Sequence, residues 1–129
     1  MAARYDKYDP ISGGFRAPLN ADWLDADVGI PFAVGLNSSG KVVKGAGQTG
    51  VRGVLVVDAK GKKANDIVDV MTSGEIVDIT SPTLIAGENY GGVNASGVIG
   101  AAGAGAGGEV GFTVEATRLI VRVSGTATT

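Results

Sequence analysis

The feature that most constrains the fold of this chain is its supply of side chains that branch at Cβ. The 129-residue sequence holds 17 Val and 8 Ile against only 6 Leu and 2 Met. Branched side chains suit the pleated, half-buried surface of a sheet better than the crowded surface of a helix. The 22 Gly residues supply turns, and they lack the third-residue period of collagen. The composition therefore predicts an all-β fold in which helices are rare.

Alternating apolar residues predict where the strands lie. The first clear run is 30–36, and the turn 37–40 then returns the chain into 41–44, so this region is expected to form a hairpin. Further strands are predicted over 51–58, 67–72 and 75–80.

The chain also repeats itself. Residues 35–42 match residues 92–99 at Gly, Asn, Ser and Gly with a constant offset, although two such turns can resemble each other by chance. A glycine-rich loop and two more strands follow each hairpin, over 53–55 and 67–70 in the first case and over 111–113 and 120–123 in the second. We therefore expect a pseudo-duplicated domain, either a small β-barrel or a closed sandwich.

The first 27 residues lack this pattern. They hold four of the seven aromatic residues of the chain, namely Tyr5, Tyr8, Phe15 and Trp23. A segment that carries large apolar side chains but has no core of its own is predicted to dock on something else. We therefore divide the chain into an extended N-terminal arm over 1–27 and a single β-domain over 28–129.

Charge and residue usage exclude several classes of function. The 11 basic and 13 acidic residues give a net charge of −2, which is too weak a field to recruit nucleic acid, and Lys60, Lys62 and Lys63 are interpreted as a solvated turn. The chain has no His and no Cys, so the usual general base, the thiolate nucleophile and the common transition-metal ligands are missing. We expect a protein that is not an enzyme and needs no cofactor and no metal.

Two further motifs resemble binding sites by their spacing or composition. The glycines of 45–50 fit a dinucleotide-binding motif by spacing, but a strand follows them where that site needs a helix. Asp22, Asp25 and Asp27 surround Trp23, but their spacing does not match a helix-loop-helix calcium site, so solvation or pairing with a partner's cations is expected.

No segment is predicted to enter or cross a membrane. The N-terminus lacks an apolar stretch of signal-peptide length, and the Gly/Ala run 97–108 is too small and too broken to span a bilayer. A soluble protein made in the cytoplasm without export is expected.

The order of glycine-punctuated strands resembles that of small capsid decoration proteins of tailed bacteriophages. The resemblance covers residues 30–123, and it is carried by segments 32–43, 50–55 and 66–77. It implies a small β-rich protein that binds the major capsid protein on the outer surface of the virion, often as a homotrimer, and stabilises the shell against the pressure of the packaged DNA. It transfers no individual binding residue.

The residues predicted to bind the capsid or a neighbouring copy all come from the arm: Arg4, Tyr5, Tyr8, Phe15, Arg16 and Trp23. The aromatic side chains are expected to fill apolar pockets, and the two arginines are expected to pair with carboxylates. The alternative is that the aromatic side chains pack back on the domain itself, Trp23 first because it lies nearest to it.

Two other functions compete with capsid binding. A carbohydrate- or receptor-binding module needs exposed rings on the rigid domain, and Tyr90 is the one plausible platform because Phe32 and Phe112 lie in apolar strand patterns. A small hydrolase would need two carboxylates about 5–9 Å apart in a cleft, and the sequence offers no such pair by spacing.

Overall fold

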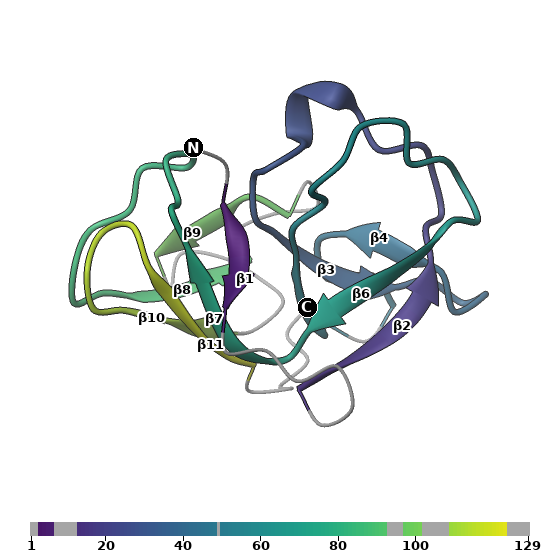
Figure 1. The fold of residues 1–129 in the computed structure, drawn as a ribbon. Coiled ribbons are helices and arrows are strands. Elements are labelled where there is room, and N and C mark those ends of the chain that lie inside the picture. The colour runs from purple at the N-terminus through teal and green to yellow at the C-terminus, as the bar shows by residue number, and fades with distance from the viewer. Residues whose placement is uncertain (1–2, 7–12, 49, 93–96, 102–108, 124–129) are drawn as a thin grey trace.

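The computed structural model describes residues 3–6, 13–48, 50–92, 97–101 and 109–123, and these residues form two antiparallel sheets. The helical element among them is a single 3-10 turn, η1 (Asp25–Asp27). The two sheets lie beside each other as separate layers (Figure 1). The all-β prediction is confirmed, and the domain is sandwich-like and not a closed barrel.

The strands divide into a six-stranded and a five-stranded sheet. Sheet A has the order β1-β7-β11-β10-β8-β9 and consists of β1 (Arg4–Asp6), β7 (Ser73–Val77), β11 (Leu119–Arg122), β10 (Glu109–Thr113), β8 (Asn89–Gly92) and β9 (Ile99–Ala101). Sheet B has the order β2-β6-β5-β3-β4 and consists of β2 (Gly14–Pro18), β6 (Ile67–Met71), β5 (Gly53–Leu55), β3 (Phe32–Leu36) and β4 (Val42–Lys44).

The predicted duplication is visible in these strand orders. The series β2-β6-β5-β3-β4 of sheet B recurs in sheet A as β7-β11-β10-β8-β9, and all the neighbouring pairs are antiparallel. The two hairpins that match in sequence, β3–β4 and β8–β9, occupy equivalent ends of the two sheets. Strand β1 is an addition to sheet A that has no equivalent in sheet B among the described residues.

Apolar side chains form two separate cores. The first lies between the sheets and includes Val54 and Met71 from sheet B and Ile76, Leu119 and Val121 from sheet A. The second lies on the other face of sheet B, beneath the chain that runs from β2 to β3; its buried members are Ala17, Leu19, Trp23, Phe32, Val34, Val42, Leu55, Val57, Val68 and Val70. Sheet B is therefore covered on both faces, which explains why every residue of β5 is buried.

The two sides of the sandwich are closed differently. On one side the sheets are joined, because Phe32 bridges Val98 and the Ala33 amide donates to the Gly97 carbonyl at 2.8 Å. On the other side, β1 and β6 flank a gap between the sheets (Figure 1). Within sheet B, β5 and β6 pair at a single position, Val54 with Met71, and then diverge.

The structure differs from the prediction of a separate arm over 1–27. Strand β1 pairs with β7, and β2 pairs with β6 along its whole length, so the described part of this segment belongs to the domain that was expected to begin at residue 28. Trp23 is buried in the second core. These strands were not predicted because they are short edge strands whose hydrogen-bond partners lie far away in the sequence.

Candidate functional site

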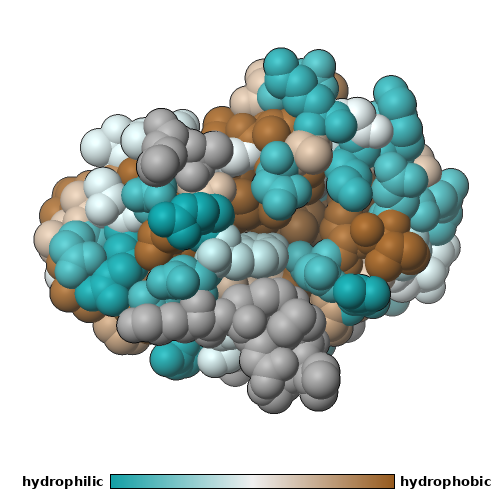
Figure 2. Space-filling model, in the orientation of Figure 1, coloured by the Kyte–Doolittle hydropathy of each residue, from teal (hydrophilic) through white to brown (hydrophobic). Residues whose placement is uncertain are grey.

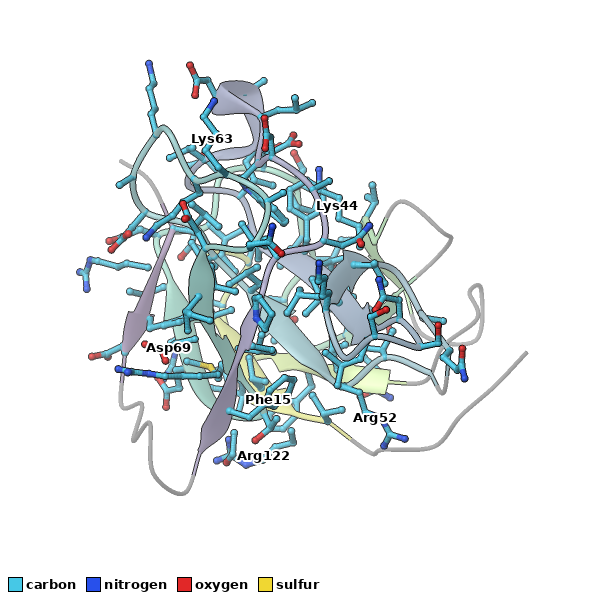
Figure 3. The ribbon with its side chains drawn as sticks, turned by 90° about the vertical axis from the view of Figure 1, so that its right-hand side faces the viewer. Phe15, Lys44, Arg52, Lys63, Asp69 and Arg122 are labelled. Atoms are coloured by element: carbon cyan, nitrogen blue, oxygen red, sulfur yellow. The ribbon has the colours of Figure 1, made fainter. Side chains whose placement is uncertain are left out.

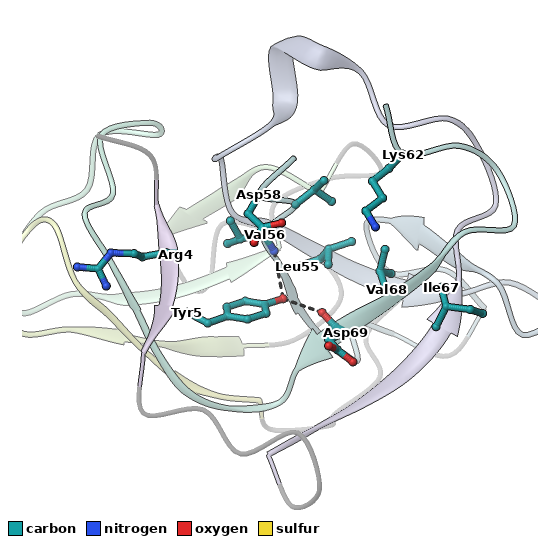
Figure 4. Close-up of a pocket in the computed structure, with 10 residues that line it drawn as sticks. Arg4, Tyr5, Leu55, Val56, Asp58, Lys62, Ile67, Val68 and Asp69 are labelled. Atoms are coloured by element: carbon teal, nitrogen blue, oxygen red, sulfur yellow. Dashed lines mark hydrogen bonds between the residues drawn. The ribbon is translucent and has the colours of Figure 1, made fainter. Parts of the chain in front are cut away.

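A cleft of about 320 Å³ opens where the chain after β5 diverges from β6, with β1 of the other sheet beside it. It is lined by β1, by β6 and by the chain that follows β5, and its lining residues are Arg4, Tyr5, Leu55, Val56, Val57, Asp58, Lys62, Ile67, Val68 and Asp69 (Figure 4). Figure 2 shows apolar side chains between the two lobes of the molecule, with hydrophilic ones around them. Apolar side chains combined with a few polar groups are typical of a ligand-binding pocket.

Tyr5 reaches from sheet A to the floor of this cleft. Its hydroxyl accepts a hydrogen bond from the Val56 amide at 3.2 Å and lies 2.8 Å from the Asp69 carbonyl and 3.3 Å from the Val54 carbonyl (Figure 4). These backbone groups belong to the two strands that diverge beyond Val54 and Met71. The phenol therefore replaces the ladder hydrogen bonds that β5 and β6 no longer make with each other.

The rim of the cleft carries both paired and unpaired charges. Arg4 Nη2 lies 3.1 Å from Asp78 Oδ2, and Arg16 Nε donates to Asp69 Oδ1 at 2.7 Å. Both arginines remain largely exposed, with 59% and 71% of their side chains accessible. Their ion pairs therefore contribute about 0–1 kcal/mol each to folding and are easily exchanged for other partners.

Lys62 differs from these arginines. Its ammonium points into the cleft (Figure 4), and it makes no ion pair with any residue that the structure describes. Asp58, at the same rim, is likewise without an ion pair in the described ranges. The cleft thus offers one cation and one anion whose charges are not already matched within the fold.

Trp23 is 7% exposed and contributes to neither the cleft nor the surface. Its ring meets that of Phe32 edge to face, with centroids 5.5 Å apart. Lys44 Nζ lies 4.6 Å from the centre of the Trp23 ring and also pairs with Asp27. This cation between two rings and a carboxylate holds the chain between β2 and β3 against sheet B.

Phe15 lies in a second, mostly apolar groove of about 390 Å³, whose lining residues are Phe15, Leu36, Arg52, Thr72 and Val123. Figure 3 shows Phe15 and Arg122 near one edge of the molecule and Lys44 well away from them. Tyr8 lies outside the described residues.

The six residues predicted to bind a partner therefore do not form one surface. Arg4 and Tyr5 line the cleft. Arg16 does not line it but forms an ion pair with Asp69, which does. Tyr5 and Trp23 are anchors within the fold, as the alternative interpretation of the aromatic side chains expected.

Sequence reasoning missed Lys62 and Ile67 as site residues. Lys62 was interpreted as part of a solvated turn, and Ile67 as the first residue of a strand. The divergence of β5 from β6 brings them to the cleft, and no local sequence pattern announces that divergence. No local sequence signal distinguishes Lys62 from Lys60 and Lys63 in the same turn.

The structure also shows the surroundings of Tyr90 and of the aspartates around Trp23. Tyr90 is 4% exposed, and its hydroxyl accepts a hydrogen bond from the Ile85 amide at 2.7 Å, so its ring is not available as a platform for a sugar. Asp22 accepts a hydrogen bond from the Ala64 amide, whereas Asp27 forms an ion pair with Lys44.

Two broader kinds of site are absent from the described residues. Within the described ranges no three acidic side chains gather in a way that would hold a metal ion. In the same part of the chain no helix is long and apolar enough to cross a membrane.

Comparison with known proteins gives a match in structure. No protein-family model matches the sequence, and no curated protein matches it. A chain from Mycobacterium phage Patience superimposes with a TM-score of 0.82 at 21% identity, over 96% of this chain and 97% of that one. At this identity the match establishes a shared fold along nearly the whole length of both chains.

Proposed function

We propose that this protein is a structural component of a tailed-phage virion that binds the outer surface of the capsid and stabilises the shell. The observation that carries the proposal is the likeness in fold to a phage chain over 96% of the length. The order of the glycine-punctuated strands supports it independently, because that order resembles capsid decoration proteins.

The cleft face is the surface that we assign to the capsid. Strands β1 and β2 are the edges of their sheets and carry Arg4 and Arg16 on a rigid framework. Both guanidinium groups are exposed and weakly held, so each can exchange its aspartate for a carboxylate of the major capsid protein. Contacts of this kind are weak singly, but a capsid offers many equivalent sites.

Assembly into a homotrimer belongs to the same proposal. Capsid lattices contain local threefold axes, and a trimer placed on one engages three equivalent sites at once. Linking the sites in this way raises the overall affinity far above that of a single contact.

The test is co-sedimentation of the purified protein with expanded, undecorated capsids of the phage that encodes it, titrated to saturation. Saturation at a fixed number of copies per capsid subunit is expected. Arg16→Ala should weaken binding, whereas the matched variant Lys41→Ala, at the far edge of sheet B, should not. If the intact protein remains in the supernatant at every concentration, the proposed function is refuted.

A further inference from the structure

We propose that the cleft is a slot for an extended peptide segment of a partner protein. The segment adds as a strand between β6 and the chain that follows β5, and it presents one acidic side chain to Lys62. This inference deepens the proposed function and rests on it only for the identity of the partner.

The free backbone edge of β6 is the first argument. Strand β6 bonds to β2 through alternate residues, because the Leu19 amide donates to the Asp66 carbonyl at 2.9 Å and the Thr72 amide donates to the Gly13 carbonyl at 2.7 Å. In an antiparallel pair the residues between these positions direct their peptide groups to the opposite side. Ile67 therefore directs its amide and carbonyl into the cleft.

The opposite wall also presents backbone groups. Phe32 is paired with Leu55 in the β3–β5 ladder, and the Gly29 amide donates to the Val57 carbonyl, so Val56 between them faces the cleft. The bond from the Val56 amide to the Tyr5 hydroxyl agrees with this direction. The Val56 carbonyl and both peptide groups of Ile67 have no hydrogen-bond partner among the described residues.

A strand edge that faces an extended backbone segment, both with unpaired peptide groups, is what an inserted strand recognises. The Tyr5 hydroxyl closes the narrow end of the slot, where β5 and β6 still pair. The wider end, between Val56 and Ile67, is the part left for a partner. A strand placed there continues the hydrogen-bonding pattern that Tyr5 begins.

The side chains of the cleft define the segment that fits it. Val68 is buried, while Ile67 is 57% exposed and offers an apolar contact to an incoming side chain. Arg4 pairs with Asp78 and the Asp69 carboxylate pairs with Arg16, whereas Lys62 is a lining cation that makes no ion pair with a described residue, so an acidic residue can bind it without breaking an existing pair. Asp58 at the same rim disfavours a second acid. An extended segment with one acidic residue between apolar ones meets these conditions, since alternate residues face opposite sides.

The first test uses the same capsid titration. We expect Lys62→Glu to weaken binding by about tenfold or more, because it places a like charge opposite the acidic residue. Lys60→Glu is the matched control, since Lys60 is exposed on the same turn, makes no ion pair with a described residue and does not line the cleft. Equal affinities of the two variants for capsids would overturn the inference.

A second test separates this inference from the proposed function. If the wild-type protein does not bind capsids, the capsid assignment fails, and the slot is then tested with the acetylated and amidated pentapeptide Thr-Val-Glu-Val-Thr. Titration into ¹⁵N-labelled protein should shift the amide resonance of Ile67, and replacing Glu by Lys in the peptide should abolish the shift. No shift with the acidic peptide would refute the slot.

Discussion

Replacing Tyr5 by Phe tests the most specific structural claim, that one hydroxyl bridges β5 and β6. The variant keeps the ring and removes the oxygen, so the Val56 amide and the Asp69 carbonyl lose their shared partner. A net hydrogen bond contributes about 0.5–1.5 kcal/mol, and a buried group left unpaired costs about 1–3 kcal/mol. Water in the cleft recovers part of this loss, because Tyr5 is only partly buried.

We therefore expect a loss of about 1–2 kcal/mol in the free energy of unfolding. For a chain of this length, that loss corresponds to a decrease in Tm of about 4–7 °C. Thermal and urea unfolding followed by circular dichroism would measure both values. Tyr90→Phe is the comparison, because it removes a single amide contact and should cost less. A Tyr5→Phe protein that melts within about 1 °C of wild type would refute the bridging role.

Three other substitutions probe the rest of the fold. Gly111 has φ +155°, and a Cβ there would lie 1.9 Å from the Ile120 carbonyl oxygen, so Gly111→Ala should cost about 3 kcal/mol or more in urea unfolding. Gly40→Ala meets no neighbour and should cost only about 1 kcal/mol; equal losses would contradict this account. Hydrogen bonding to Arg118 lowers the pKa of Glu115 from its ordinary value of 4.5. The ion pair therefore stabilises the folded protein fully above pH 4.5, and this stabilisation is lost as the pH falls through the lowered pKa. Glu115→Gln should melt below wild type at pH 7 and match it at pH 2; a gap of equal size at both pH values would show that the ion pair is not the cause.

The hairpins and their repetition could be predicted from sequence because their evidence is local. Alternating apolar residues and an Asn/Gly turn specify β3 and β4 without reference to the rest of the chain. Strand β1 has no such signal, since it is three residues long and pairs with Ser73–Val77.

The orientation of Phe112 shows a second limit. It was interpreted as part of an apolar strand pattern, but it is 41% exposed. The pairing of β10 with β8 shifts by one residue between Glu109 and Gly111, and such a shift turns the following side chains to the other face. The site has the same limit. Arg4 and Tyr5 were predicted to bind a partner from an extended arm, whereas the structure places both in strand β1 at the cleft, where the Tyr5 hydroxyl bonds to the backbone of the domain itself.

The position of β1 has a consequence for the order of events during synthesis. Its partners in the sheet are residues 75–77, and the hydroxyl of Tyr5 contacts residues no earlier than Val54. At about 5–20 residues per second, the ribosome takes several seconds to make the chain that β1 needs. Strand β1 can therefore be placed only after residues 75–77 have been made, and until then the cleft lacks the Tyr5 hydroxyl that closes its narrow end.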